Sequence, residues 1–335
     1  MKFQNKFFTL LVIGFLAVYS ASPIAYARKK QSTSEITLQK AKQGDVKAQK
    51  ALGFMYAAGK GVTQNYVEAI KWYRLAAAQG DAEGQFIIGS MYQYGRGVTQ
   101  DYAEAIKWYR LAAAQRNAGG RLFLGNMYYS GQGVTQDYAE AIKWYRLAAA
   151  QGDAKAQYNI GVMYYKGQGV TQDYAEAIKW YRLAAAQGNI GSYLFFGNMY
   201  YSGLGVTQDY AEAIKWYRLA AAQGDAKAQY YIGVMYYNGQ GVTQDYAEAI
   251  KWYRLAAAQG DAKAQYNIGI MYYKEQGVTQ DYVRAYMWAN IAAVQGGADA
   301  VKTRNVIASK MTPQELEKAQ KMARDCKAKN FKKCD

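Results

Sequence analysis

Paired carboxylates are the first residues in this sequence that could do chemistry. An Asp followed three positions later by a Glu recurs along the chain, as at Asp173 and Glu176, and two carboxylates can serve as general acid and general base. Each pair, however, stands at the start of a stretch with helical periodicity, where Asp and Glu side chains satisfy free backbone N–H groups. Helix capping therefore accounts for these pairs without catalysis.

Other catalytic groups are missing from the sequence. The chain has no histidine, which excludes Ser-His and Cys-His nucleophiles, HExxH zinc sites and imidazole acid–base catalysis. None of its serines begins an S-x-x-K motif. We therefore predict no catalytic residue, no metal site and no cofactor, and we expect the protein not to be an enzyme.

A strict repeat determines where any binding residue can lie. The glycine of GVTQ recurs every 36 residues from Gly61 to Gly277. All seven tryptophans keep the same spacing, at Trp72, Trp108, Trp144, Trp180, Trp216, Trp252 and Trp288. A period of this length is typical of stacked structural repeats.

Each unit of the repeat predicts two helices. In one copy, Asp153 begins a helix that runs to about Lys166 and stops at Gly167, because glycine tolerates the left-handed backbone of a helix end. A second helix begins at Asp173 and ends at Gly188. Its apolar stripe comprises Ala177, Trp180, Tyr181 and Ala184. One helix pair cannot bury such a stripe alone, so we predict that the copies stack on one another.

The stretch AQYNIGVMYYKGQGVTQDYAEAIKWYRLAAAQG resembles the Sel1-like repeat, a relative of the tetratricopeptide repeat. The small-residue-Leu/Ile-Gly, Gly-x-Gly-Val, Asp-Tyr-x-x-Ala and Trp-Tyr-x-x-Ala-Ala-x-x-Gly positions of that family are all present. The resemblance implies an all-α fold, a right-handed α-solenoid of seven 36-residue helix-turn-helix repeats with N- and C-terminal capping helices. It further implies a protein-interaction scaffold of a kind often exported or associated with the bacterial envelope. The expected copies span residues 45–80, 81–116, 117–152, 153–188, 189–224, 225–260 and 261–296.

Residues 1–27 are typical of a signal peptide. Lys2 and Lys6 precede an apolar run, and small residues end at Ala27, after which we expect cleavage. The run is short for a membrane-spanning helix, which needs roughly 20 residues, so we expect no transmembrane segment after cleavage. These features predict a location in the periplasm or outside the cell.

A basic charge remains after this cleavage. The formal net charge falls from +16 to +14, because residues 1–27 contain two lysines and no acidic residue. Outside the cytoplasm such an excess favours anionic envelope polymers or acidic protein surfaces as partners over nucleic acid. Part of it lies at the ends of the mature chain, where solvated lysines are the simpler explanation.

The two ends of the array are predicted to be caps. Residues 28–44 form an arm and a helix that covers the first copy, and residues 297–335 contain two polar helices, from about Ala298 to Ser309 and from Pro313 to Ala328. Thr312, Pro313 and Glu315 predict a capping box at the last helix. Its end carries Cys326 and Cys334, the only cysteines, which in an exported protein favour a disulfide over free thiols or a metal site.

Two helix ends depart from the glycine pattern. Arg116 replaces the glycine found at Gly152, and Glu275 replaces the glycine found at Gly239. Either substitution bends the array locally, or it is tolerated at a cost of about 1 kcal/mol.

Binding residues are expected on the first helix of each copy, where the copies differ most. By analogy with tetratricopeptide packing, Gln157, Ile160, Gly161 and Tyr164 face neighbouring helices, and the opposite stripe lines a concave groove. The candidates on this stripe are Asn126, Tyr129, Lys155, Tyr158, Tyr165, Asn198, Tyr201, Lys227, Tyr230, Tyr237, Lys263, Tyr266 and Tyr273. Tyrosine combines a large contact area with a polar tip. If the stripe faces solvent, alanine at Tyr158, Tyr230 and Tyr266 leaves the thermal midpoint nearly unchanged.

These features predict a monomeric, non-enzymatic scaffold that binds a protein or peptide in its groove, with roles in the envelope or in host interaction. The alternative is a binder of anionic envelope glycan or peptidoglycan, in which tyrosines stack on sugars and lysines meet anionic groups. A more remote alternative is a cell-wall-related hydrolase of the cysteine-rich Sel1-like type, although those proteins carry a cysteine pair in each repeat and this chain does not.

Overall fold

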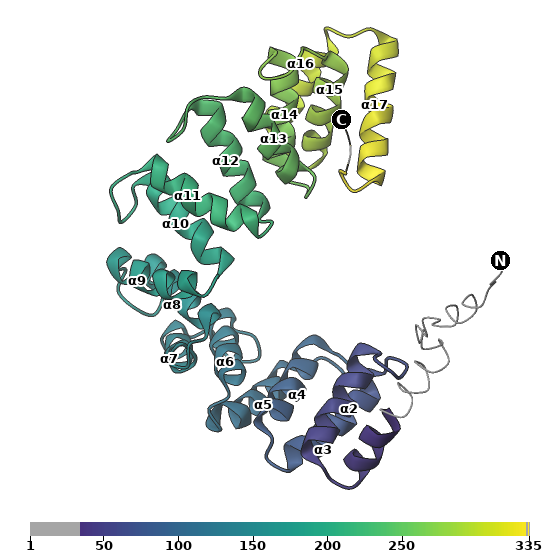
Figure 1. Ribbon diagram of the computed structural model, residues 1–335, viewed down its shortest axis with the longest axis vertical. Helices are drawn as coiled ribbons and strands as arrows, with labels where there is room; N and C mark the ends of the chain where they lie inside the picture. Colours follow the sequence, from purple (N-terminus) through teal and green to yellow (C-terminus); the bar gives the residue numbers. More distant parts are fainter. Residues whose placement is uncertain (1–33, 333, 335) are drawn as a thin grey trace, which may run out of the picture. The chain divides into compact units, whose positions relative to one another are not determined.

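The computed structural model of the chain describes residues 34–332 and residue 334, and within this part every element of regular structure is a helix (Figure 1). This confirms the predicted all-α class. The predicted signal peptide, with its cleavage after Ala27, lies outside the described residues, as do residues 28–33.

The helices belong to two compact units, which are described separately. The unit that ends at Gly120 contains helical residues 34–42 and four further helices. These are α2 (Val46–Ala58), α3 (Tyr66–Ala78), α4 (Ala82–Tyr94) and α5 (Tyr102–Ala114). Here α2 packs on α3, α3 on α4 and α4 on α5, the order expected of stacked helix pairs.

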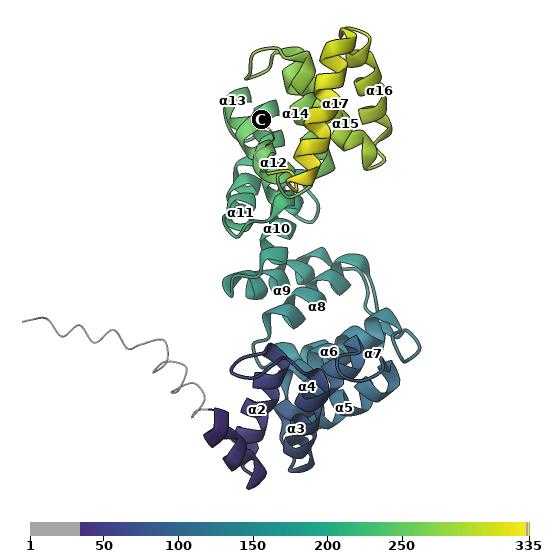
Figure 2. The ribbon, with the colours of Figure 1, turned by 90° about the vertical axis from the view of Figure 1, so that its right-hand side faces the viewer.

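The unit that begins at Arg121 contains most of α6 and all later helices (Figure 2). These helices are α6 (Ala118–Ser130), α7 (Tyr138–Ala149), α8 (Ala154–Lys166), α9 (Tyr174–Ala186), α10 (Ile190–Ser202), α11 (Tyr210–Ala222), α12 (Ala226–Asn238), α13 (Tyr246–Ala257), α14 (Ala262–Lys274), α15 (Tyr282–Val294), α16 (Ala298–Ala308) and α17 (Pro313–Ala328). From α7 to α16 each helix packs on the next in the chain. None of the described helices is both long enough and apolar enough to cross a bilayer.

Helix α8 starts and stops as predicted. An Asp153 side-chain oxygen accepts a hydrogen bond from the Ala156 N–H at 2.8 Å. At the other end Gly167 takes a left-handed conformation with φ 67°, and its N–H donates to the Met163 carbonyl. Aspartate and glycine therefore set the two ends of this helix.

The capping box predicted at α9 forms only in part. Asp173 accepts from the Glu176 N–H at 2.9 Å, but Glu176 does not reach back to the cap. It accepts instead from Lys179 Nζ at 2.8 Å and from Trp180 Nε1 at 3.1 Å. The reason is that the Asp173 N–H already donates to the Tyr164 carbonyl at 3.0 Å. The box predicted at α17 is complete.

The buried face of the second helices contains three of the four residues of the predicted stripe, the fourth, Trp180, being half-buried, and it explains a glycine of the first helices. Ala177, Tyr181 and Ala184 are fully buried in α9. The Tyr181 ring lies against Gly161 of α8, where an added Cβ would come within 2.8 Å of the ring. Glycine at this position therefore admits a tyrosine ring between the two helices of a pair.

The N-terminal end of the first unit is covered as predicted. Ala41 of helical residues 34–42 is buried with Leu52 of α2, and Leu38 packs against the same cluster. The Gln49 side chain donates to the Ala41 carbonyl at 3.2 Å. This short helix thus removes from water a face of α2 that has no preceding repeat to cover it.

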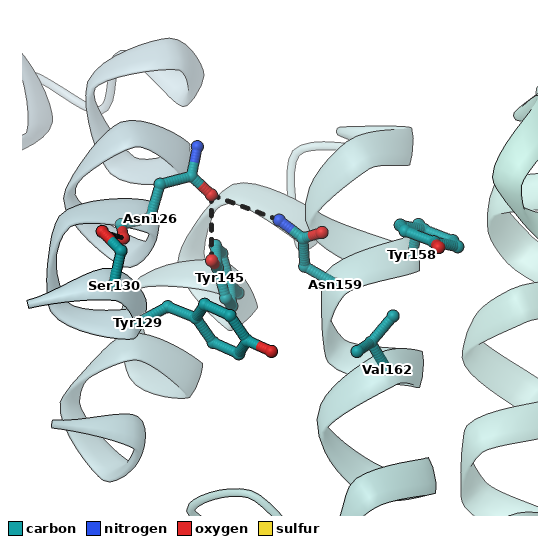
Figure 3. Close-up of a pocket in the computed structure, with 7 residues that line it drawn as sticks. All are labelled: Asn126, Tyr129, Ser130, Tyr145, Tyr158, Asn159 and Val162. Atoms are coloured by element: carbon teal, nitrogen blue, oxygen red, sulfur yellow. Dashed lines mark hydrogen bonds between the residues drawn. The ribbon is translucent and has the colours of Figure 1, made fainter. Parts of the chain in front are cut away.

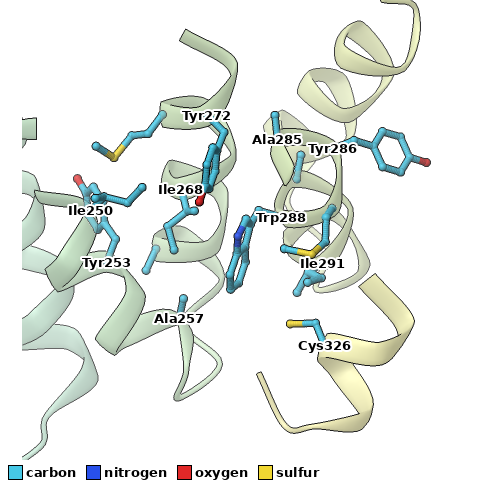
Figure 4. Close-up of a cluster of buried hydrophobic side chains, with 14 of the residues drawn as sticks. Ile250, Tyr253, Ala257, Ile268, Tyr272, Ala285, Tyr286, Trp288, Ile291 and Cys326 are labelled. Atoms are coloured by element: carbon cyan, nitrogen blue, oxygen red, sulfur yellow. The ribbon is translucent and has the colours of Figure 1, made fainter. Parts of the chain in front are cut away.

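The C-terminal end is covered by α17, which packs on α15 (Figure 4). Ile291 of α15 is 6% exposed, whereas Leu255, at the same place in the preceding copy, is 50% exposed. Cys326 of α17 is buried in the same cluster as Trp288 and Ile291 and forms a disulfide with Cys334. The last helix therefore caps a face that earlier copies leave open to solvent.

The two replaced glycines keep the glycine conformation. Arg116 has φ 63° and Glu275 has φ 58°, both in the left-handed region. The Glu275 N–H donates to the Met271 carbonyl, as the Gly239 N–H does to the Met235 carbonyl. Both helices thus end with the same backbone conformation as in the other copies, at the cost of backbone strain. This favours a tolerated substitution over a local bend of the array.

Candidate ligand-binding site

A cavity of about 400 Å³ opens between α6, α7 and α8 in the second unit (Figure 3). It combines aromatic rings with amide and hydroxyl groups. Its lining residues are Asn126, Tyr129, Ser130, Tyr145, Tyr158, Asn159 and Val162. Cavities of roughly 300–1,000 Å³ with a few convergent polar groups are common sites for small ligands.

The floor of this cavity is Tyr145, which α7 contributes and which is 2% exposed. Its ring lies against Gly125 of α6, where an added Cβ would come within 2.5 Å of the ring. The absence of a side chain at Gly125 therefore lets the ring lie close against α6. Burial raises the pKa of Tyr145, so the phenol stays neutral and acts as a hydrogen-bond donor.

Two amides hold the floor in place. Tyr145 Oη donates to Asn126 Oδ1 at 2.9 Å, and Asn159 Nδ2 donates to the same oxygen at 3.3 Å. Nδ2 of Asn126 and Oδ1 of Asn159 lie outside these two hydrogen bonds (Figure 3). The site thus presents one further donor and one further acceptor, a pair that can recognise an amide or a hydroxyl.

The tyrosine walls are tied to their neighbours. Tyr129 Oη donates to Gln168 Oε1 at 2.8 Å, and its ring packs edge-on against Tyr138 at 5.2 Å between centroids. Tyr158, on the other wall, packs against Tyr181 at 5.6 Å. Both rings are therefore positioned before any ligand binds, which lowers the entropic cost of binding.

A second, smaller cavity of about 190 Å³ lies between α12, α13 and α14. Tyr253 forms its floor and Asn267 its edge, and each stands 108 residues after its counterpart in the first cavity. The full lining is Tyr237, Tyr253, Tyr266, Asn267, Ile270 and Lys274. The same kind of pocket therefore occurs twice in this unit.

Exposed lysines lie on the helices that line the two cavities. Lys155, Lys227 and Lys263 are exposed on the same helices, and Lys263 Nζ lies 6.0 Å from the centre of the Tyr230 ring. No carboxylate lines either cavity. In the part of the chain that the structure describes, no cluster of three or more potential metal-ligating Cys, Asp or Glu residues occurs. The geometry suits binding, with lysines that favour an anionic partner.

The family profile of the Sel1 repeat matches this chain at seven places, which together cover most of the described residues. The matches are residues 46–81, 82–117, 120–153, 154–189, 192–225, 226–261 and 262–297. The chain belongs to the Sel1 repeat family. Its fold is accordingly a seven-repeat α-solenoid, and members of this family generally serve as scaffolds for protein interactions.

A solved structure supports the assignment, and a second is reported beside it. A Sel1 repeat protein from Oxalobacter formigenes is 34% identical, with a TM-score of 0.67, and the alignment covers 82% of this chain and 80% of that protein. The c5321 protein, a protective antigen present in uropathogenic Escherichia coli strains, is 29% identical with a TM-score of 0.42 over 93% of this chain and 86% of its own. A comparison with curated proteins found no match.

The structure places some of the predicted binding residues together in the two cavities. Asn126, Tyr129 and Tyr158 line the first cavity, and Tyr237 and Tyr266 line the second. The other candidates lie on first helices outside both cavities, and their role in binding stays a prediction. They are Lys155, Tyr165, Asn198, Tyr201, Lys227, Tyr230, Lys263 and Tyr273.

The tyrosine stripe is less exposed than predicted. Tyr158, Tyr230 and Tyr266 are half-buried, and burial raises the pKa of Tyr158 and Tyr230. Tyr230 also packs against Tyr253 at 5.9 Å. In place of an unchanged thermal midpoint, we therefore expect alanine at these positions to lower it, because the half-buried rings pack against other helices.

Sequence reasoning missed several lining residues, among them Tyr145, Asn159, Tyr253 and Asn267. The two tyrosines belong to the apolar stripe and were interpreted as core. A signal for the asparagines was present, because Asn159 and Asn267 stand where neighbouring Sel1 repeats carry Phe195 and Tyr231. A small polar residue at a repeat position that is aromatic in other copies indicates an unfilled space between helices.

Proposed function

We propose that this protein is a non-enzymatic scaffold that acts outside the cytoplasm and binds a protein partner on the first helices of its second unit. The observation that carries the proposal is the cavity between α6 and α8, where preorganised tyrosine walls and two asparagines face the same space. The partner is a protein segment with apolar side chains for the cavities and acidic residues for the nearby lysines.

Export is supported by two features of the chain. Residues 1–27 have the basic, apolar and small-residue segments of a signal peptide. Cys326 and Cys334 form a disulfide, and disulfides persist mainly in oxidising compartments. A periplasmic or secreted protein combines both.

An anionic envelope glycan is the second candidate partner. It is favoured by the exposed side chains of Lys155, Lys227 and Lys263 on the tyrosine-rich first helices, where Lys263 Nζ lies 6.0 Å from the centre of the Tyr230 ring. Against it, several tyrosine faces along these helices are already covered by other rings, since Tyr158 packs on Tyr181 and Tyr217 stacks on Tyr231. A protein segment fits the buried geometry better.

Site-specific photo-crosslinking tests the proposal. A benzoylphenylalanine at Lys155, which is exposed beside the first cavity, is compared with one at Leu183, which is 50% exposed on a second helix. After irradiation in envelope extract, we expect one discrete product at Lys155 that protease removes and that Leu183 does not give.

The type of product decides between the two candidates. The glycan would be favoured by a product at Lys155 that a muramidase removes and a protease does not. It would also be favoured by a product without protein whose yield falls steeply when salt is added before irradiation. Equal labelling at Lys155 and Leu183 would contradict any specific face.

A further inference from the structure

The first cavity has a filled copy of itself 72 residues further along the chain. Six of its seven lining positions carry the same residue there, and the seventh is Tyr231 in place of Asn159. The six identical positions are Asn198, Tyr201, Ser202, Tyr217, Tyr230 and Val234. One side chain thus separates an open cavity from a closed one.

The ring of Tyr231 takes the place of a ligand. It stacks on the buried Tyr217 with 5.0 Å between centroids and only 8° between planes. It also lies 6.0 Å from Tyr201 and 5.4 Å from Tyr230, the counterparts of the cavity walls. The chain itself therefore shows which chemical group this space accepts.

Phe195 repeats the arrangement between α8 and α10. It stacks on Tyr181 at 4.1 Å and meets Tyr165 edge-on at 4.6 Å and 87°. Tyr181 Oη is buried without a hydrogen-bond partner, because Val162 and Phe195 stand where Asn126 and Asn159 stand around Tyr145. An aromatic ring, that of Phe195, thus occupies this space even though the Tyr181 hydroxyl has no hydrogen-bond acceptor there.

We propose that each open cavity anchors an aromatic side chain of the partner, whose ring stacks on Tyr145 or on Tyr253 as Tyr231 stacks on Tyr217. The inference rests on the proposed function, since the ring belongs to a bound protein segment. Stacked and edge-on aromatic contacts are favourable geometries for ring pairs, and both are already built into the walls.

The volume of the second cavity and the lysines near it limit which partner side chain can bind there. The second cavity, of about 190 Å³, is smaller than the roughly 300–1,000 Å³ of typical small-ligand sites, so it suits one side chain better than a disaccharide. Lys274 lines that cavity, and Lys263 lies on the same helix. The expected partner segment carries Phe, Tyr or Trp with Asp or Glu nearby in sequence.

The test uses p-cresol, the side chain of tyrosine, as the probe and N-acetylglucosamine as its sugar counterpart. Binding to the full mature chain is followed by saturation-transfer NMR and by contacts from the probe to the Val162 and Ile270 methyl groups. We expect p-cresol to bind at two sites and the sugar at neither. Saturable sugar binding at these methyl groups without p-cresol binding would overturn the proposal.

Two kinds of variant make the test specific. Asn159→Tyr with Asn267→Phe fills both cavities with residues that neighbouring repeats carry at the same position, and should abolish p-cresol binding. Tyr231→Asn recreates the lining of the first cavity and should raise the number of sites from two to three. Thermal midpoints are measured for both. If the filled variant folds and still binds p-cresol as the wild type does, the proposal fails, whatever Tyr231→Asn shows.

Failure of this inference can be told apart from failure of the proposed function. If the filled variant loses p-cresol binding but keeps the protease-sensitive Lys155 crosslink, the scaffold stands and the aromatic anchor of its partner is refuted. If p-cresol binds as expected and no protein crosslink forms, the protein partner is refuted, and with it the anchor.

Discussion

Exchange of a glycine and a glutamate between two equivalent helix ends tests whether backbone strain is stored in this array. Glu275 ends α14 with φ 58° and ψ 41°, and Gly239 ends α12 with φ 70° and ψ 34°. Each N–H donates to the methionine carbonyl four residues earlier. The two sites thus differ in side chain while they share backbone conformation and hydrogen bond.

The expected free energies follow from this geometry. A left-handed residue with a side chain costs roughly 1–2 kcal/mol, and the greater freedom of glycine in the unfolded chain returns about 0.4–1 kcal/mol. Glu275→Gly should therefore raise the free energy of unfolding by about 0.5–1 kcal/mol. Gly239→Glu should lower it by more, about 1–2 kcal/mol, because an added Cβ lies 3.3 Å from Gln244 Cβ.

Urea unfolding followed by far-UV circular dichroism measures both changes. With a denaturant slope of roughly 2 kcal/mol per molar urea, Glu275→Gly should raise the midpoint by about 0.3–0.5 M. Glu275→Ala is the matched control, because alanine removes the carboxylate and keeps the strain. A gain for Glu275→Ala equal to that for Glu275→Gly would show that the charge, and not the backbone, is unfavourable. A loss for Glu275→Gly would refute the reasoning.

Three further predictions concern packing, modularity and the C-terminal cap. Tyr158→Ala and Tyr230→Ala should each lower the free energy of unfolding by about 2 kcal/mol, which is less than the loss for a fully buried aromatic residue. An unchanged midpoint of unfolding would show that these rings face solvent. Deletion of residues 225–260 should leave a folded helical protein, because Asp261 would then take the place of Asp225, and the backbone N–H of each donates to an alanine carbonyl at 3.2 Å. A deletion of 18 residues from Asp225 should unfold more of the chain, and an equal loss of helical circular dichroism signal in both deletions would contradict the stacking of repeats. The oxidised protein should show no free thiol after denaturation, and two reactive thiols in protein from its native compartment would contradict the disulfide. The double variant Cys326→Ser and Cys334→Ser should fold with about 2–3 kcal/mol less stability and should lose its C-terminus to protease sooner than the wild type.

Much of the fold could be predicted from the sequence because the period repeats each local signal seven times. Asp153 and Gly167 mark helix ends through hydrogen bonds within a few residues, and such signals are readable from one copy. The Glu176 side chain could not be predicted in this way. Its partner depends on whether the Asp173 N–H is free, and the Tyr164 carbonyl, nine residues earlier, accepts from that N–H.

The candidate site was only partly predictable, for a related reason. The sequence places Asn126, Tyr129 and Tyr158 on one face of their helices, which requires only the helical period. It does not show that these tyrosines are half-buried, because the burial comes from other helices: Tyr158 packs on Tyr181 of α9 in its own repeat and lies against Gly191 of α10 in the next. Nor does it show that Tyr145, on the apolar stripe of a second helix, is the floor of a cavity.

Near-identical repeats make single differences informative once the packing is known. Between the surroundings of Tyr145 and of Tyr217, six lining residues are the same, so the cavity follows from the change of Tyr231 to Asn159 alone. Phe195 and Tyr231 close the two interfaces in the middle of the second unit, and Asn159 and Asn267 leave open the ones on either side. A uniform array would bind alike at every repeat. Filling some positions with the chain's own rings leaves two separated anchors, so a partner segment that carries aromatic residues at the matching separation gains both contacts, and one with a different separation gains only one.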